Sequence, residues 1–390
     1  MKTTKYFLSM AALALVGAMT VSCSSDDNIT DQPQQQEVTK NNVVTLTTTV
    51  SLDGSATTRA LSIEGNKGVK TFAAGETMAV IYHNGTSTVK AVSHALEAGD
   101  ITNEGKNATF TFDLETPTKS GDVLYIYPAA MAGDTGVDIT KLNTQEGTFD
   151  ALQSKYDLCT NFGAWDGDNL PSLTLENHLA ILAITLKDEA GTSDITSSTT
   201  KLTLSDGTNT YNVNREASDG PIYVAIFPTA DATITVTATD GTKNYIKTLT
   251  GKTYAKGNGY PVSWRMAKGV IWNSTDISSI DFNYEEGSKE IRGITFACDY
   301  SSGFSGSTLS SISGNISFTS SLGNIKKIEI NHSGSGYWYG AEGFDGWPSD
   351  YDAGVGTFTW EGTPTDKVEL PETSGWSEIS GITSIVFTLE

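Results

Sequence analysis

Apolar and polar residues alternate with a period of two along most of the chain after Val43, and helical periodicity is almost absent. Such alternation places successive side chains on opposite faces of a strand. Leu179–Leu186 is apolar at both parities, so we expect it to be a central strand buried on both faces. The predicted strands are Val43–Ser51, Thr77–Tyr82, Thr109–Leu114, Asp122–Tyr127, Leu179–Leu186, Ile222–Phe227, Ala232–Ala238, Tyr260–Trp264, Ile325–Asn331 and Ile382–Leu389.

Turn-forming dipeptides separate many of these strands. They are Asp53-Gly54, Asn84-Gly85, Asp206-Gly207, Asp240-Gly241 and Asn258-Gly259. Asn-Gly and Asp-Gly adopt the backbone angles that tight β-turns require. Many short strands joined by such turns are typical of stacked sheets, so the sequence predicts an all-β fold made of β-sandwiches.

A repeated strand ending divides the body of the chain. Asp122–Ala130 reads DVLYIYPAA and Ile222–Ala230 reads IYVAIFPTA, which puts Pro128 and Pro228 100 residues apart. Proline lacks the amide hydrogen of a ladder bond, so each one predicts the end of a strand. Chance similarity between two strand ends is the alternative explanation.

The domain boundaries follow from this repeat and from a change in composition. We predict one β-sandwich at 43–170, a second of related topology at 171–268, and a β-rich domain at 269–390. The last domain is rich in Gly and Ser, and it holds five of the seven tryptophans of the chain.

The N-terminus has the pattern of an export signal that ends in a lipid-modified cysteine. Lys2 and Lys5 precede the apolar run Phe7–Val21, which is shorter than the roughly 20 residues of a membrane-spanning helix. Residues 1–22 are therefore predicted to be a signal peptide, and Cys23 the acylated first residue of the mature chain. Thr20 departs from the usual Leu of such a signal, and an ordinary secretory signal is the alternative.

The residues after Cys23 are polar and predict a flexible tether at 23–42. Ser24-Ser25-Asp26-Asp27 resembles the acidic signal that follows the lipid cysteine in surface-exported lipoproteins of the Bacteroides group. We therefore expect a chain anchored by lipid in the cell outer membrane and exposed at the surface.

Composition and charge exclude several partners. Hydrophobic residues make up 38% of the chain and charged residues 18%, which is typical of a chain with packed cores. The formal net charge of −21 repels phosphate backbones, so no nucleic acid partner is expected. Cys159 and Cys298 are isolated and distant in sequence, and we expect two separate buried thiols rather than a disulfide, which stays possible.

No motif of catalysis or cofactor binding stands out. The four histidines are scattered, and the glycine-rich segments lack the context of a phosphate or dinucleotide site. Asp345, Asp350 and Asp352 do not match the spacing of a calcium-binding loop. We expect no metal, no cofactor and no enzymatic activity. The alternative is a pair of catalytic carboxylates that are distant in sequence and come together only in the folded chain.

Several segments together resemble the fimbrillin-like lipoproteins of Bacteroides and its relatives, the subunits of donor-strand pili. Their order and spacing carry the resemblance, which covers about Val43–Lys268. Besides the lipoprotein start, the matching segments are Thr57-Thr58-Arg59-Ala60, Phe72-Ala73-Ala74-Gly75-Glu76, Met78–Tyr82, Leu175–Leu182, Tyr223–Pro228, Leu249-Thr250-Gly251-Lys252 and Gly257–Val262. The resemblance implies two tandem transthyretin-like β-sandwich domains.

The resemblance also implies a mechanism of assembly. In polymerising members of the family an Arg-directed protease cuts after the first strand, and a terminal strand of another subunit fills the groove that opens. Arg59 and Ala60 stand at the matching position. Ile385, Phe387 and Leu389 share one face of the last predicted strand and are candidates for a donor strand. The alternatives are an ordinary loop arginine and a resident terminal strand.

The tail beyond the resemblance is a candidate binding module. Tyr337, Trp338, Tyr339 and Trp347 lie among glycines and aspartates, and aromatic faces with nearby carboxylates suit a glycan. A role in a hydrophobic core is the alternative. Because glycine-rich loops tend to be exposed, we expect Trp338 at the surface rather than Trp360.

These observations give two hypotheses for function. The first is a pilus subunit, or an accessory or tip adhesin associated with a pilus, that joins other pilin subunits by strand addition and contacts a host or bacterial glycan or protein. The second is a surface lipoprotein that binds glycans and never polymerises.

Overall fold

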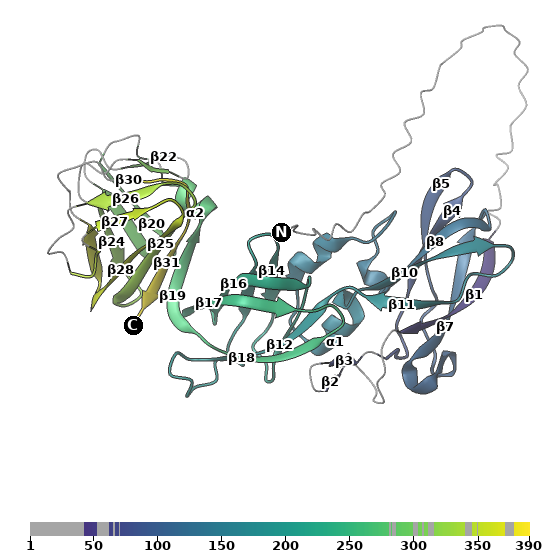
Figure 1. The fold of residues 1–390 in the computed structure, drawn as a ribbon. Coiled ribbons are helices and arrows are strands. Elements are labelled where there is room, and N and C mark those ends of the chain that lie inside the picture. Colours follow the sequence, from purple (N-terminus) through teal and green to yellow (C-terminus); the bar gives the residue numbers. More distant parts are fainter. Residues whose placement is uncertain are drawn as a thin grey trace, which may run out of the picture. The chain divides into compact units, whose positions relative to one another are not determined.

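The computed structural model describes residues 43–52, 62–64, 67–69, 71–280, 282, 286–298, 303–305, 308–310, 316–339, 345–348, 350–370 and 378–390. Strands dominate this part of the chain, and the few helices are single turns or slightly longer. The fold is all-β, as predicted, and is built of several sheets (Figure 1). Buried apolar residues form three hydrophobic cores. Within the described residues, no helix has both the length and the apolar character to cross a membrane.

The first core lies inside an eight-stranded sheet with the order β5-β4-β8-β10-β11-β1-β7-β6. A separate hairpin, β2 and β3, follows the first strand. The bounds are β1 Val43–Leu52, β2 Ser62–Glu64, β3 Lys67–Val69, β4 Ala79–Asn84, β5 Ser87–Val92, η1 Ala98–Asp100, β6 Ile101–Thr102, η2 Asn103–Gly105, β7 Asn107–Glu115, β8 Ser120–Tyr127, β10 Cys159–Asp166 and β11 Leu173–Asn177.

Strand β7 shows why the sequence folds in this way. Ala108, Phe110, Phe112 and Leu114 alternate with polar residues, and all four are completely buried in the first core. A shift of one residue in register would move this whole row to solvent, so the alternation fixes the pairing of β7 with its neighbours.

The second core lies between a three-stranded sheet, β15-β12-β18, and the strands β17-β16-β13-β14-β9. β12 pairs on both sides and is buried at both parities, which confirms the predicted central strand. The bounds are η3 Ala129–Met131, η4 Ile139–Asn143, β9 Thr144–Gln145, α1 Phe149–Ala151, η5 Leu152–Tyr156, β12 Ala180–Lys187, β13 Lys201–Ser205, β14 Thr210–Asn214, β15 Ile222–Ile226, β16 Thr229–Thr239, β17 Asn244–Tyr254 and β18 Gly259–Arg265.

The short helical turns between β8 and β10 were not expected from the sequence. Met131, Leu142, Leu152 and Tyr156 of this segment pack into the second core rather than the first. Pro128 directly follows the end of β8, and Pro228 follows the end of β15 by two residues, which confirms that each marks a strand exit. The predicted domain boundaries themselves stay a prediction.

The third core draws its residues from β19 and from later strands, among them β21, β24, β25, β28 and β31. β19 pairs with β17 at two positions and then with β31 at five, so it takes part in the sheets of two cores. The bounds are β19 Ala267–Asn273, α2 Ser274–Ser278, β20 Gly287–Ile291, β21 Ile294–Cys298, β22 Gly303–Ser305, β23 Thr308–Ser310, β24 Ile316–Ser320, β25 Ile325–His332, β26 Gly336–Tyr339, β27 Asp350–Ala353, β28 Gly356–Thr365, β29 Lys367–Leu370, β30 Glu378–Ile379 and β31 Ile382–Leu389.

The two cysteines of the body belong to different cores. Cys159 is buried in the first core and Cys298 in the third, and both are thiols. The thiol of Cys159 lies 2.9 Å from Oδ1 of Asn177. The prediction of two separate buried thiols is therefore confirmed.

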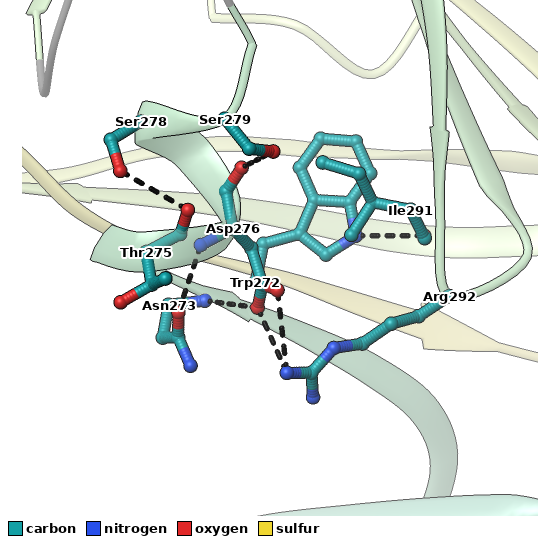
Figure 2. A network of polar contacts seen from close by, with 8 residues as sticks. All are labelled: Trp272, Asn273, Thr275, Asp276, Ser278, Ser279, Ile291 and Arg292. Atoms are coloured by element: carbon teal, nitrogen blue, oxygen red, sulfur yellow. Dashed lines mark hydrogen bonds and ion pairs between the residues drawn. The ribbon is translucent and has the colours of Figure 1, made fainter.

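A polar network ties helix α2 to the turn between β20 and β21 (Figure 2). Asn273 and Asp276 form a capping box, in which each side chain accepts from the backbone N–H of the other residue. Asp276 also pairs with Arg292 at 3.1 Å, and Trp272 Nε1 donates to the carbonyl of Ile291. Arg292 has a φ of 52°, which costs energy in a non-glycine residue, so the ion pair holds a strained turn in place.

The variant Asp276→Ala tests this network. We expect the free energy of unfolding to fall by about 1–2 kcal/mol, because the backbone N–H of Asn273 loses its carboxylate acceptor and Arg292 loses its ion pair. The Asn273 side chain still accepts from the backbone N–H of residue 276 in the variant. Urea unfolding measures the change. Arg292→Asn is the matched control: it removes only a half-exposed ion pair and keeps a residue that tolerates positive φ, so its effect stays within about 0.5 kcal/mol. Equal losses in both variants would assign the effect to the ion pair instead.

Candidate functional site

Strand β1 is the first strand that the structure describes, and it is held unequally on its two sides. It pairs antiparallel with β7 at nine positions, from Val43 to Ser51. On the other side it pairs in parallel with β11 at only three, from Val50 to Leu52. One long ladder and one short one therefore connect β1 to the sheet.

The inward face of β1 closes part of the first core. Val50 and Leu52 are buried there, and Leu46 packs partly against the same core. Between them Thr48 is also buried, with 4% of its surface exposed. Full burial of a Val or Leu side chain contributes about 1.5–3 kcal/mol, so β1 covers the core with only a few apolar groups.

The outward face of β1 carries a row of hydroxyl contacts with its neighbours. Thr45 Oγ1 donates to Asp113 Oδ1 at 2.6 Å, and the hydroxyls of Thr49 and Thr109 lie 3.0 Å apart. The hydrogen bond from Thr45, followed by that from His94, lowers the pKa of the Asp113 carboxyl. These contacts are exposed to water and contribute little to the free energy of holding the strand.

Loss of β1 would open a groove with defined walls. β7 would expose the edge that now bonds to β1, and β11 would expose three residues of its own edge. The inward faces of these walls are apolar: Phe110 and Phe112 of β7 and Leu175 of β11 pair side by side with residues of β1 and are completely buried in the first core. Unpaired strand edges beside apolar side chains bind an extended segment by adding it as a strand.

The predicted lipidation and processing residues lie outside the described residues. Cys23 belongs to the segment before Val43, and Arg59 and Ala60 lie between β1 and β2. In the sequence, Arg59 follows the last residue of β1 by seven positions. Lipidation at Cys23 and a cut after Arg59 stay predictions.

The structure places the predicted donor strand inside the chain's own third core. β31 lies between β19 and β25 and pairs with both. Ile385 and Phe387 are completely buried, and Leu389 is 4% exposed. This arrangement favours the alternative of a resident strand, because its two neighbours already satisfy the edges that a donor strand would offer to another subunit.

The structure corrects the expectation that Trp338 is at the surface. Trp338 is completely buried and stacks on Phe358, with ring centroids 5.5 Å apart. Trp347 is also buried, stacks on the same ring at 4.9 Å, and donates through Nε1 to the carbonyl of Glu369. Neither ring face is available for a sugar, because each belongs to the third core. The side chains of Tyr337 and Tyr339 lie outside the described residues.

Sequence reasoning missed one partly buried contact of the site. The carbonyl oxygen of Pro171 accepts hydrogen bonds from Thr48 Oγ1 at 2.8 Å and from the Tyr125 hydroxyl at 2.9 Å. Thr48 and Pro171 are 123 residues apart in the chain, so no local pattern could have paired them. In the sequence, Thr48 is one of four threonines in the first strand, and no local feature distinguishes it from the other three.

Comparisons with known proteins give distant structural likenesses. No family model matches the chain, and no curated protein matches it. Among solved structures, a fimbrial assembly protein from Parabacteroides distasonis has 12% identity and a TM-score of 0.31, and the match covers 58% of this chain and 94% of that chain.

Two further solved structures are similar to the same extent. A proposed cell adhesion protein from Bacteroides fragilis has 13% identity and a TM-score of 0.34, with 58% of this chain and 93% of that chain covered. Another from Bacteroides uniformis has 16% identity and a TM-score of 0.31, with 57% and 93% covered. Likenesses at these TM-scores are too low to support an argument about function.

Proposed function

We propose that this chain is a non-catalytic cell-surface lipoprotein, anchored in the outer membrane through lipid on Cys23, that acts as a pilus subunit or a pilus-associated adhesin. A cut between Arg59 and Ala60 frees β1, and an extended strand of another subunit takes its place. The resemblance of the sequence to fimbrillin-like lipoproteins supports this proposal.

The attachment of β1 is the observation that carries the proposal. The strand has a complete ladder on one side, a ladder of three pairs on the other, and only a few apolar side chains in the core. A strand held mainly by main-chain hydrogen bonds can be replaced by another strand that makes the same bonds. An incoming strand therefore forms again most of the hydrogen bonds that are lost when β1 leaves.

Apolar side chains on the two strands that flank β1 supply the driving force for the exchange. Phe110, Phe112 and Leu175 would meet water if β1 left without a replacement. Exposing an apolar row costs roughly 25 cal/mol for each Å², so the opened groove favours any strand that covers it again. The opened form is therefore reactive toward strands and short-lived, as an assembly intermediate has to be.

Treatment of the purified mature chain with an Arg-specific protease tests the proposal. We expect cleavage first at Arg59, because it lies in a Ser- and Thr-rich segment, whereas Arg265 lies within a strand and Arg215 is held by backbone carbonyls at Thr196 and Ser218. Arg292 lies in the short turn between β20 and β21 and is held by Asp276, so we expect a cut there to be slower. Mass spectrometry identifies the cut, and size-exclusion chromatography with electron microscopy then shows oligomers.

Arg59→Gln is the control for this experiment. The variant should resist the first cut and stay monomeric under the same treatment, while its thermal unfolding remains that of the parent chain. If the parent chain is cut at Arg59 and still remains a monomer at high concentration, with partner subunits or without them, strand exchange is not its function.

A further inference from the structure

The ladder between β1 and β11 ends before Thr48. Val50 is the first residue of β1 that pairs with β11, at Leu173. At Thr48, two residues earlier, the link to the neighbouring segment is made by a side chain instead of the main chain. The Thr48 hydroxyl donates a hydrogen bond to the carbonyl of Pro171 at 2.8 Å. The contact is partly buried, so it contributes more than the exposed hydroxyl contacts on the other face of the strand.

Two further contacts, from Tyr125 and from Gly163, hold the Pro171 carbonyl in place. The Tyr125 hydroxyl donates to the same carbonyl oxygen at 2.9 Å, and burial raises the pKa of Tyr125, which keeps the phenol protonated. On β10, a Cβ added at Gly163 would lie 2.8 Å from Pro171 Cγ, so the proline ring packs directly on that glycine. Pro171 therefore presents a fixed carbonyl to whatever strand lies in the position of β1.

Such a position discriminates between side chains. Valine has the shape of threonine but no donor, so it would leave the carbonyl with the Tyr125 hydroxyl alone. Lysine would bury a charge in the first core without a counter-ion. A larger aliphatic side chain would have to displace the tightly packed Pro171 or Tyr125, and overpacking of this kind is destabilising.

We infer that the groove under β1 selects an incoming strand that has threonine or serine at the position of Thr48 and apolar residues at those of Leu46, Val50 and Leu52. The inference rests on the proposed strand exchange and names the chemistry of the partner. The small hydroxyl residue sets the register, because a slip of two residues would bring an apolar side chain against the Pro171 carbonyl.

A competition experiment on the nicked chain tests the inference. The mature chain is cut at Arg59, which leaves β1 in place without a covalent link to the body. Labelled ten-residue peptides with the sequence of 43–52 then compete with β1, and fluorescence anisotropy reports the bound fraction. The peptides are the parent sequence, Thr48→Val, Thr48→Lys and Thr47→Val.

The matched control is Thr47→Val, since Thr47 is the exposed neighbour of Thr48 and the chemical change is identical. We expect half-displacement by Thr48→Val at roughly a fivefold to tenfold higher concentration than by the parent peptide. Thr47→Val should stay within about twofold of the parent, and Thr48→Lys should fail to displace β1.

The outcomes separate this inference from the proposed function. If the parent peptide replaces β1 and Thr48→Val competes equally well, the groove exchanges strands but does not select for a hydroxyl. If no peptide displaces β1 even in large excess, β1 is a permanent strand, and both the exchange and the selection are wrong.

Discussion

Trp338→Ala is expected to lower the free energy of unfolding of the third core by roughly 3–5 kcal/mol, a range typical of truncating a large buried aromatic residue. Trp338 is completely buried, and its ring stacks on Phe358, which also packs against Trp347 and Tyr351. Alanine at this position leaves a cavity the size of an indole ring. The surrounding strands cannot close such a cavity without breaking their own pairing.

Hydrogen–deuterium exchange of peptides from β25, β28 and β31 measures this loss, together with urea unfolding of the whole chain. Val355→Ala is the control, because Val355 is 75% exposed and its truncation should change stability by less than about 0.5 kcal/mol. If the Trp338→Ala variant keeps its protection against exchange but loses adhesion, Trp338 contacts a ligand at the surface instead.

Removal of the last strand should have a larger effect still. Deletion of Ile382–Glu390 takes away the strand between β19 and β25 together with Ile385, Phe387 and Leu389. Both neighbours would lose a ladder, and the core would lose several large buried side chains at once. Each such loss costs roughly 2–5 kcal/mol, so their sum is comparable to the roughly 5–15 kcal/mol by which a typical domain is stable. We expect the third core to unfold while the other two keep their protection.

Limited proteolysis and hydrogen–deuterium exchange report on the stability of each of the three cores individually in this experiment. Glu390→Ala is the control, since it changes only an exposed terminal side chain. A truncated chain that keeps the third core folded but no longer assembles would show that β31 acts as a donor strand. Unfolding confined to the third core would show that β31 is a structural part of it.

The strands are the part of the fold that the sequence predicts best. All of the predicted strands overlap strands of the structure, because a half-buried strand needs the alternation that β7 and β25 display. The short helical turns from Ala129 to Tyr156 were missed, since elements of three to five residues are too short to show a helical period. Parallel pairing, as between β1 and β11, links residues far apart and leaves no local signal.

The candidate site was harder to predict than the strands around it. Alternation identifies which residues of the last strand share a face, but it does not say whether that face fills its own core or another subunit's groove. Trp338 illustrates the same limit, because nearby glycines favour exposure while the packing of Phe358 decides burial. The role of Thr48 depends on a carbonyl in a distant loop, which only the folded chain brings near.

The position of β1 in the chain adds a consequence to the proposed lipid anchor. In the sequence, Cys23 precedes β1 and the predicted cut at Arg59 follows it. With lipid on Cys23, a cut at Arg59 would leave β1 on the membrane side of the break and the remaining strands on the other side. Displacement of β1 would then release the body from the membrane, so that detachment from the cell and incorporation into a fibre would be a single event.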